Sequence, residues 1–571
     1  MKNKEIAQLF TKFADILEFQ GENVFKINAY RKASRVISDS IEDIEILWKE
    51  KRLSELSGIG KALQEKISEY IQTGKVGAFE NLIAEIPEEL FTLLSIQGYG
   101  PKTAALAHKE LNVETVEDLQ RVLEDGRLAA LPGMGAKKIM NLKKGIEFLK
   151  SVSDRFSIAA VLPVVGAIID HMQNHKEPLI NRILPAGSIR RFKETVHDID
   201  ILAESDKSRD TIKHFLSFPA IRRKIGAGQT KASVLLEDGL QVDLRVVPSG
   251  SFGAALQYFT GSQAHNVRVR ELARKKGLKI NEYGVFQQER QIAGESEAEV
   301  YQSIDMPFIA PELREDRGEI EAALENRLPD LIEITDIKGD LHIHSLYSDG
   351  HMSIAEMAGH LRDFGYEYAA ICDHSKSAFY ANGLSEERLW RQQDEIRALN
   401  QQYTDFTLLS GIEVDILPDG TLDFSDNVLE QLDFVIASIH SAFKSDPTLR
   451  IMEAMKNPFV DVIGHPTGRL ISRREAYSVD MKTIIDMAVK TGTALEINSF
   501  WDRLDLNDIH SKLAVESGVK LAINTDSHHD QHLEMIQFGV GTARRGWCSK
   551  LDVINAWDLK RLKDWQKRNR L

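Results

Sequence analysis

The sequence has no long apolar run and very little cysteine. No stretch of about 18 consecutive apolar residues occurs, which argues against a membrane-spanning helix. The first ten residues, MKNKEIAQLF, carry a charge where a secretion signal needs its apolar part, so we expect no export. Two cysteines, Cys372 and Cys548, are too few for a disulfide framework. We therefore expect a cytoplasmic protein with no membrane partner.

Low-complexity segments are also missing, and 571 residues are too many for one hydrophobic core. At about 150 residues per domain, the length predicts about four units. A hydrophobic content of 43% with 28% charged residues is typical of a globular chain. The last 251 residues carry −13 of the net charge of −14 and 11 of the 17 histidines. The first 320 residues are thus nearly neutral, which leaves room for basic patches that bind nucleic acid.

Three similar Gly-apolar-Gly turns lie in the first 150 residues, which otherwise show helical periodicity. Such a turn lets the backbone approach a phosphate closely, and its amides can bond the phosphate oxygens. Because backbone amides read no base, the turns predict sequence-independent nucleic-acid binding. The alternative is a plain turn between helices. The glycines and following lysines are Gly58, Gly60 and Lys61; Gly98, Gly100 and Lys102; and Gly133, Gly135 and Lys137.

Two aspartates, Asp198 and Asp200, lie two residues apart on a predicted strand, so their side chains share one face. Asp243 adds a third carboxylate from another predicted strand. Like charges repel unless a cation lies between them, and oxygen ligands suit Mg²⁺. With the upstream loop, this set predicts two-metal phosphoryl or nucleotidyl transfer, the alternative being a polar strand edge with incidental acids. The loop residues are Gly187, Ser188, Arg190 and Arg191.

Short apolar strands alternate with helical stretches from about residue 338, which indicates βα units around a parallel sheet or barrel. Nine metal-type side chains follow these strands, and strand ends converge on one mouth of a barrel. They are too many for one ion and suit two or three Mn²⁺, Zn²⁺ or Fe²⁺ ions. Isolated core or surface histidines are the alternative. The nine residues are His342, His344, Asp349, His374, Glu413, His440, His465, Asp526 and His528.

Several segments resemble family X DNA polymerases. The turns resemble helix-hairpin-helix motifs, and Phe25–Ser34 looks like the N-terminal domain of that family. Gly187-Ser188 with Asp198-Ile-Asp200 is similar to the nucleotidyltransferase palm. The string Tyr258-Phe-Thr-Gly-Ser262, followed by His265–Arg270 and Ile280–Gly284, is similar to the segment that contacts the nascent base pair.

This resemblance implies a role for each matching residue. Asp198, Asp200 and Asp243 would hold Mg²⁺ or Mn²⁺, and Asp243 would help to activate the primer 3′-OH. The nucleotide would be bound by Gly187, Ser188, Arg191, Tyr258, Phe259, Gly261 and Asn266. DNA would be contacted by Tyr30, Arg270 and the three turns. Lys66 would form a Schiff base with an abasic deoxyribose, the alternative being an exposed structural lysine; an imine needs a neutral amine. His197 departs from the family, which has a glycine there.

Residues 338–571 resemble the PHP (polymerase and histidinol phosphatase) domain, a metal-dependent phosphoesterase. The nine ligand positions match one by one, which implies a working metal centre. In bacterial enzymes of this architecture the domain trims 3′ ends and acts at abasic sites. Arg469 and Arg473, just after His465, are candidates for phosphate contacts or plain surface arginines.

We therefore predict a multidomain α+β and α/β chain. It combines a helical helix-hairpin-helix N-terminal domain, a nucleotidyltransferase palm with a mixed sheet, and a C-terminal PHP distorted (βα) barrel. The predicted domains are 1–85 and 86–150 (helical), 151–245 (palm), 246–318 (thumb-like, binding the nascent base pair), 319–337 (linker) and 338–571 (PHP).

The predicted function is template-directed filling of short DNA gaps in base excision repair, with 3′–5′ exonuclease and AP-endonuclease activity in the PHP domain. The expected partners are gapped or nicked DNA and dNTPs, and we expect a monomer. Two alternatives stay open. One is a template-independent or RNA-directed nucleotidyltransferase, and the other is a non-catalytic scaffold that binds DNA ends.

Overall fold

The computed structural model describes residues 2–38, 44–56, 59–84, 88–94, 96, 99–135, 138–143, 146, 155–443 and 446–569. The chain forms two compact units, Met1–Asp154 and Arg155–Leu571. No helix within the described ranges combines the length and the apolar character that crossing a bilayer would require.

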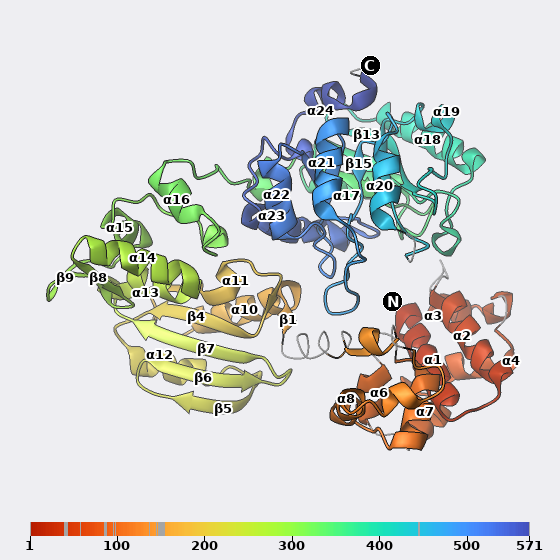
Figure 1. The fold of residues 1–571 in the computed structure, drawn as a ribbon, viewed down its shortest axis with the longest axis horizontal. Helices are drawn as coiled ribbons and strands as arrows, with labels where there is room; N and C mark the ends of the chain where they lie inside the picture. Colours follow the sequence, from red (N-terminus) through yellow and green to blue (C-terminus); the bar gives the residue numbers. More distant parts are fainter. Residues whose placement is uncertain are drawn as a thin grey trace. The chain divides into compact units, whose positions relative to one another are not determined.

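The first unit is built from helices joined by short turns (Figure 1, red to orange). In one hydrophobic core the rings of Phe13 and Phe79 stack with their centroids 3.7 Å apart, and Tyr30 meets both rings edge-on. A second core lies among the later helices. The elements are α1 (Lys2–Phe19), α2 (Val24–Ser38), α3 (Ile44–Lys49), η1 (Leu53–Glu55), α4 (Lys61–Thr73), α5 (Gly77–Ala84), α6 (Glu88–Leu94), α7 (Pro101–Leu111), α8 (Val116–Glu124) and η2 (Leu128–Ala130).

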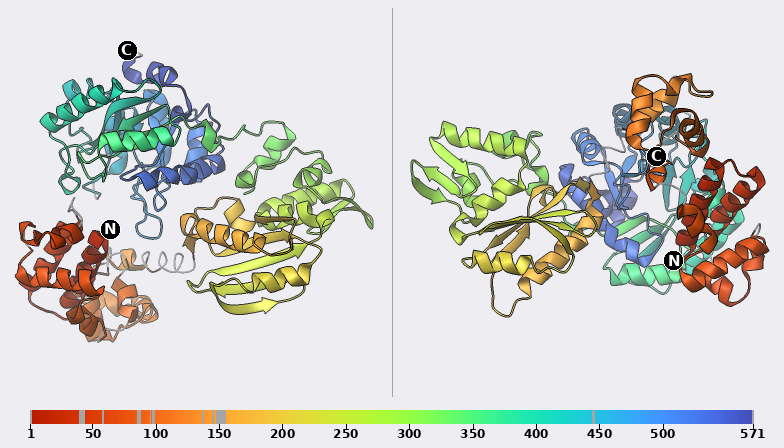
Figure 2. Two further views of the ribbon diagram at one scale, coloured as in Figure 1. Left: turned by 180° about the vertical axis from the view of Figure 1, so that it is seen from behind. Right: turned by 90° about the horizontal axis from the view of Figure 1, so that it is seen from below.

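The second unit begins with a mixed five-stranded sheet in the order β2-β4-β7-β6-β5, seen as a yellow layer in Figure 2. Only the β4–β7 pair is parallel, and the other pairs are antiparallel. Buried and half-buried residues alternate along β6, as expected for a sheet with one face on the core. The elements are β1 (Phe156–Ser157), α10 (Ile158–Gln173), β2 (Arg182–Pro185), α11 (Gly187–Arg190), β3 (Thr195–Val196), β4 (Asp198–Glu204), α12 (Ser208–Phe215), β5 (Ile221–Ala227), β6 (Lys231–Leu236) and β7 (Gln241–Val247).

A thumb-like segment follows, with two longer helices and a three-stranded antiparallel sheet. Fully buried Arg314 donates to Glu297 at 2.6 Å, and Glu297 also pairs with Arg190 of the palm. These ion pairs fasten the segment to the palm. The elements are η3 (Ser249–Ser251), α13 (Phe252–Thr260), α14 (Gln263–Lys275), β8 (Leu278–Asn281), β9 (Gly284–Gln287), β10 (Arg290–Ala293), α15 (Glu297–Gln302), η4 (Pro311–Leu313), α16 (Glu319–Leu324) and η5 (Ile334–Asp336).

Seven parallel strands form the last sheet, in the order β11 to β17, with helices on its outer side (Figure 1, teal to blue). A parallel bridge between Ile343 and Ser527 brings the two edges together, so the barrel is nearly closed. The strands are β11 (Gly339–Ile343), β12 (Tyr368–Ile371), β13 (Thr407–Asp415), β14 (Phe434–Ser438), β15 (Val462–Ile463), β16 (Ala494–Asn498) and β17 (Leu521–Asn524). The helices are α17 (Ile354–Asp363), η6 (Phe379–Ala381), α18 (Glu386–Asn400), α19 (Asp426–Leu429), α20 (Pro447–Met455), α21 (Met481–Thr491), α22 (Asp508–Glu516), η7 (Asp530–Met535), α23 (Ile536–Arg545), η8 (Ile554–Ala556), α24 (Leu559–Trp565) and η9 (Lys567–Asn569).

The barrel packs directly on the palm through α23 and the loop between β16 and α22. Leu504 and Phe538 belong to the same hydrophobic core as the palm strands. A Cβ at Gly541 would lie 2.1 Å from the ring of Phe192, so only glycine allows this approach. Phe192 itself has a φ of 55°, a left-handed conformation that is costly for a bulky residue. The contact therefore holds the palm loop after α11 in a fixed conformation.

Replacing Gly541 by alanine should loosen this packing. Overpacking of this kind costs about 1–3 kcal/mol, so we expect a lower midpoint of thermal unfolding. Gly359→Ala in α17 is the matched control, because an added Cβ there meets no neighbouring atom within 4 Å. That control should gain up to about 1 kcal/mol from helix propensity. Equal midpoints for the two variants would contradict the close approach.

Two candidate active sites

Three carboxylates meet on neighbouring strands of the palm sheet. Asp200 on β4 lies opposite Asp243 on β7, and Asp198 shares its face two residues earlier. Burial, followed by the negative charges of Asp198 and Asp243, raises the pKa of Asp200 to about 6. The strand register thus forces like charges together. A divalent cation held by these oxygens would relieve the repulsion, so the donor set fits the predicted metal ions.

One of the three carboxylates has a positive partner. The ammonium of Lys231 lies 2.8 Å from Asp243, and the amide of Gln241 donates to the same carboxylate at 3.2 Å. Burial works to raise the pKa of Asp243. These contacts and a hydrogen bond from Ser233 outweigh burial and hold that pKa below its usual value. Lys231 therefore provides the positive charge that keeps Asp243 ionised, a role that local sequence patterns did not reveal.

The loop at the start of α11 approaches the carboxylates so closely that it needs a glycine. Gly187 has a φ of 59°, and a Cβ there would lie 2.4 Å from a carboxylate oxygen of Asp200. Ser188 follows at the first turn of α11. Arg190 points elsewhere, because its guanidinium pairs with Glu297 and donates to Thr260 at 2.6 Å.

A cleft of about 600 Å³ collects most of the predicted nucleotide site. It brings together residues of β4, α11, α13 and α14 that lie far apart in the sequence. Asp243 is beside the cleft, next to Asp200, rather than among its lining residues. Predicted residues in the lining are Gly187, Ser188, Arg191, His197, Asp198, Asp200, Tyr258, Phe259, Gly261, Asn266 and Arg270. Lining residues that sequence reasoning missed are Arg155, Lys193 and Gln263.

Two of the predicted nucleotide contacts are held by the protein itself. The guanidinium of Arg191 donates to Glu315 at 3.0 Å and to the carbonyl of Thr260. The amide of Asn266 donates to the Tyr258 carbonyl at 2.7 Å and accepts from Gln257 at 2.8 Å. These bonds orient both side chains within the cleft.

The predicted DNA contacts of the first unit are partly described. Gly60 and Gly100 are the N-caps of α4 and α7, with an exposed lysine, Lys61 or Lys102, beside each turn. Gly133 has a left-handed φ of 77°, and Gly135 follows it. Gly58, Gly98 and Lys137 lie outside the described residues.

Two further predictions fall in the same unit. Lys66 is partly exposed on α4, where its ammonium lies 3.5 Å from the Ala62 carbonyl. Tyr30 is only 7% exposed, because its ring packs in the aromatic core. Most of the Tyr30 side chain is therefore buried in the core, and little of it is accessible to DNA.

All nine predicted ligands of the barrel converge. The six imidazoles each lie within 4 Å of one of three carboxylates, which are Asp349, Glu413 and Asp526. Glu413 is central, with His374 at 2.9 Å and His465 at 3.1 Å from its oxygens. Three overlapping groups could each hold an ion: His344, Asp349, His374 and His528; His342, His344 and Asp526; and His374, Glu413 and His440.

The chemistry of this cluster fits metal ions. Buried ring nitrogens of His342, His344 and His374 lie 3.5, 3.1 and 2.9 Å from carboxylate oxygens but do not make well-aligned hydrogen bonds to them, and a cation between these atoms would satisfy both. Burial, with the charges of His528 and His374, lowers the pKa of His344 to about 4, so its ring is neutral. Burial works to raise the pKa of Glu413. The charges of His440, His342 and His374 outweigh burial and hold that pKa well below its usual value. Although burial works to lower them, nearby carboxylates raise the pKa values of His342, His374, His440 and His528, so a bound cation would displace protons from these rings. Neutral imidazoles and ionised carboxylates are the forms that bind divalent metals.

A second layer orients the ligands. Glu496 accepts from His342 at 2.7 Å, Asp415 accepts from His440 at 2.9 Å, and Asn498 donates to Asp526 at 3.0 Å. Such partners fix which ring nitrogen faces the metal. Sequence reasoning missed all three, although the polar pair Glu496 and Asn498 in an otherwise apolar strand was a signal.

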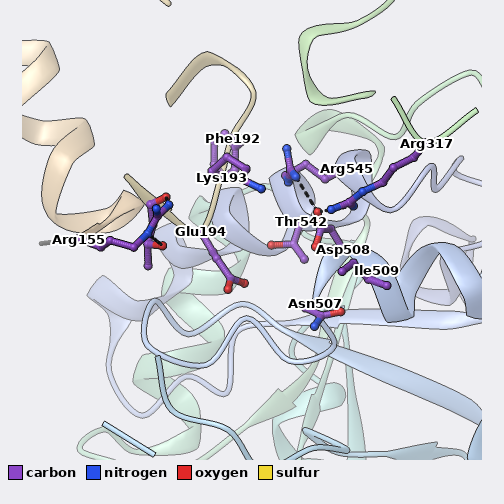
Figure 3. A pocket seen from close by; sticks show the side chains of 11 residues that line it. Arg155, Phe192, Lys193, Glu194, Arg317, Asn507, Asp508, Ile509, Thr542 and Arg545 are labelled. Carbon is purple, nitrogen blue, oxygen red and sulfur yellow. Dashed lines mark hydrogen bonds and ion pairs between the residues drawn. The ribbon is translucent and has the colours of Figure 1, made fainter. Parts of the chain in front are cut away.

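A second cavity, of about 400 Å³, lies where the palm loop after α11 meets α22 and α23 of the barrel (Figure 3). Asp508 pairs with both Arg317 and Arg545, at 2.9 Å and 2.6 Å. Arg545, with only 3% of its side chain exposed, also donates to Glu315 and to the backbone oxygen of Arg191 at 2.6 Å. A barrel residue thus holds the palm loop that bears Arg191.

The two arginines that follow His465 are also paired. Arg469 pairs with Glu194 of the palm at 2.7 Å, and Arg473 pairs with Asp502 at 3.0 Å. Arg469 therefore forms another link between the barrel and the palm.

The palm with its clustered carboxylates and the barrel with its metal-type ligands define the class of protein: an enzyme with two active sites that acts on nucleic acids. Family models agree along the chain: a helix-hairpin-helix domain matches residues 1–76, a SAM-like helix-hairpin-helix tandem 88–147, the DNA polymerase beta thumb 255–315 and the PHP domain 340–500. The chain is 41% identical to the DNA polymerase/3′-5′ exonuclease PolX of Bacillus subtilis, over the full length of both.

Two other relatives match parts of the chain. A probable phosphatase of Thermoanaerobacter sp. (strain X514) is 28% identical over 40% of this chain and 94% of its own length. DNA polymerase lambda of Arabidopsis thaliana is 25% identical over 55% of this chain and 62% of its own. The chain belongs to the bacterial family X DNA polymerases that carry a C-terminal PHP domain. The predicted family and fold class are confirmed.

Replacing Gly187 by alanine should reduce nucleotide incorporation on gapped DNA by about a hundredfold or more, through backbone strain and the clash with Asp200. Exonuclease activity should stay within about twofold, because the barrel ligands are untouched. Gly226→Ala on β5 of the same sheet is the control, since an added Cβ there meets no atom within 4 Å. Normal incorporation by the Gly187 variant would rule out the close approach.

Proposed function

We propose that the palm fills short gaps in DNA by template-directed synthesis from dNTPs, and that the barrel is a metal-dependent 3′–5′ exonuclease that also acts at abasic sites. The observation that carries this proposal is the presence of two separate ligand clusters in one chain. Three carboxylates lie at a nucleotide-sized cleft, and nine imidazoles and carboxylates converge at the mouth of a nearly closed barrel. The full-length similarity to a relative named for both activities supports the assignment.

In the palm, Asp198, Asp200 and Asp243 would hold Mg²⁺ or Mn²⁺, which when bound stabilise charge on the attacking and leaving oxygens. Asp243 would also help to activate the primer 3′-OH, which attacks the α-phosphate of the dNTP in line, so that a new phosphodiester forms, the α–β phosphoanhydride bond breaks and pyrophosphate leaves. Lys231 keeps that carboxylate ionised until the site is loaded.

The nucleotide would lie along the cleft with its phosphates at the α11 loop. Ser188 and Arg191 would contact the triphosphate, and Lys193 and Arg155 add positive charge to the same wall. Tyr258 and Phe259 would pack against the sugar and discriminate ribose from deoxyribose, and Gly261 lines the same cleft. Asn266 would meet the incoming base and Arg270 the template strand.

DNA would be held mainly through its backbone. The amides at the turns ending in Gly60, Gly100 and Gly135, with the adjacent lysines, would bind phosphates beside the gap without reading sequence. On α4, Lys66 would act on an abasic deoxyribose.

In the barrel, two or three divalent ions (Mn²⁺, Zn²⁺ or Fe²⁺) would be held by the nine ligands, and when bound they supply hydroxide and stabilise the leaving oxygen. Glu496 and Asp415 keep the imidazoles oriented for this task. Because a non-catalytic scaffold would need neither two separate ligand clusters nor a nucleotide-sized cleft, the geometry favours the enzymatic assignment.

Two substitutions should separate the activities. On a one-nucleotide gap with dNTPs and Mn²⁺, Asp198→Asn should lower synthesis by about a thousandfold or more and leave exonuclease activity intact. His344→Ala should do the reverse. Loss of both activities in either variant would contradict two separate sites. Replacing dNTPs by NTPs in the same assay, or omitting the template, tests the alternative nucleotidyltransferase assignments.

A further inference from the structure

Exposed aromatic rings gather at the mouth of the barrel. Among the described residues of the PHP domain, the large exposed aromatic side chains are Phe364, Phe379, Tyr380 and Phe443. Phe379 and Tyr380 follow the ligand His374 on the loop after β12, and Phe443 follows His440 on the loop after β14. Phe364, at the C-terminal end of α17, leads into β12 and so lies at the opposite end of the barrel. The exposed rings therefore concentrate on the side of the metal-type cluster.

Tyr380 connects this aromatic rim to the cluster. Its ring centroid lies 6.2 Å from that of His374 and 6.4 Å from that of His440. Phe379, the preceding residue, is 88% exposed, the largest exposure of any large hydrophobic side chain in the described structure. Phe379 adjoins Tyr380, which lies beside the candidate metal ligands. Its exposed ring is therefore placed to stack on a flat ligand that extends to the cluster.

Hydrogen bonds anchor the loop that carries Phe379, so its ring is exposed on an ordered loop. Ser377 donates its amide to Asp423 at 2.6 Å, and Asn382 donates to the carbonyl of Ser348 at 3.3 Å. Arg388 in turn donates to the Asn382 carbonyl at 2.8 Å. The loop backbone has lost conformational entropy on folding, but the ring of Phe379 gains no burial in return. A bound partner that covers the ring would supply that burial.

We propose that Phe379 stacks on the unpaired base of the nucleotide that is removed at a DNA 3′ end, with Tyr380 as the wall between that base and the metal-type cluster. Aromatic rings bind single-stranded nucleic acid in this way because every base offers a flat face. The ligands His342 and His344 are fully buried, so a phosphodiester must pass the loops at the strand ends to reach the cluster, which an unpaired strand does more easily than a duplex. Arg474, over the ring of Phe443 at 5.2 Å, adds positive charge at the same rim.

This inference rests on the proposed exonuclease function. Stacking on any base should depend little on sequence, so the site would trim 3′ ends without reading them. It also predicts faster trimming of unpaired or frayed ends than of paired ones, since a base within a duplex already has both faces covered.

The test compares two single-stranded oligonucleotides in Mn²⁺ with the full-length protein. They are identical except that one ends in a normal 3′ nucleotide and the other in a tetrahydrofuran abasic analogue. Phe379→Ala should raise KM on the normal end by about tenfold, the usual size of one stacked base, with little change in kcat. On the abasic end the variant and the wild type should agree within about twofold, because there is no base to stack. Phe379→Trp should restore the wild-type KM.

Phe364→Ala is the matched control, an exposed phenylalanine at the other end of the same barrel, and should leave both substrates unchanged. An equal loss on both ends, or no loss on the normal end, would overturn the stacking proposal. If the wild type releases no nucleotide from either substrate, the exonuclease function itself fails, an outcome distinct from both.

Discussion

Crowding of ionisable side chains inside the fold is the constraint on which both sites depend. In the palm, the parallel register of β4 and β7 sets Asp200 beside Asp243 and leaves Asp198 on the same face. A free chain would keep three carboxylates apart, so the sheet must supply the energy that holds them together. Burial of the surrounding apolar residues, Ile199, Ile201 and Val242 among them, supplies that energy. The fold also supplies the energy at the barrel mouth, where strand ends press six imidazoles and three carboxylates into one largely buried group.

Much of this arrangement could be predicted from local patterns. Period-two spacing correctly places Asp198 and Asp200 on one face of a strand, and apolar runs that end in His or Asp correctly indicate parallel strands with ligands at one mouth. The glycine before Ser188 also has the expected structural reason, because it lies against Asp200. These features are encoded within a few residues of each other, which is why a single sequence reveals them.

The contacts that escaped prediction join residues that are distant in the chain. Lys231 pairs with Asp243 across a hairpin, Glu496 orients His342 across the barrel, and Arg545 reaches the loop of Arg191. No spacing rule links positions 191 and 545, since their meeting depends on how two separately built cores pack. Arg190 shows the same limit, because a motif places it beside Arg191 but only the fold shows that Glu297 binds it.

The packing of the barrel on the palm makes the polymerase cleft depend on a domain with a different chemistry. Arg545 is nearly fully buried and is shared by Glu315, Asp508 and a backbone oxygen of the palm loop. Separating the two domains would leave the carboxylates of Glu315 and Asp508 with fewer positive partners. Breaking buried ion pairs of this kind lowers the free energy of unfolding by several kcal/mol. Apolar contacts add to it, since Phe192 would lose the face it packs on Gly541. The loop that carries Arg191 is consequently shaped from both sides, by the palm strands that continue from it and by a barrel helix more than three hundred residues away in sequence.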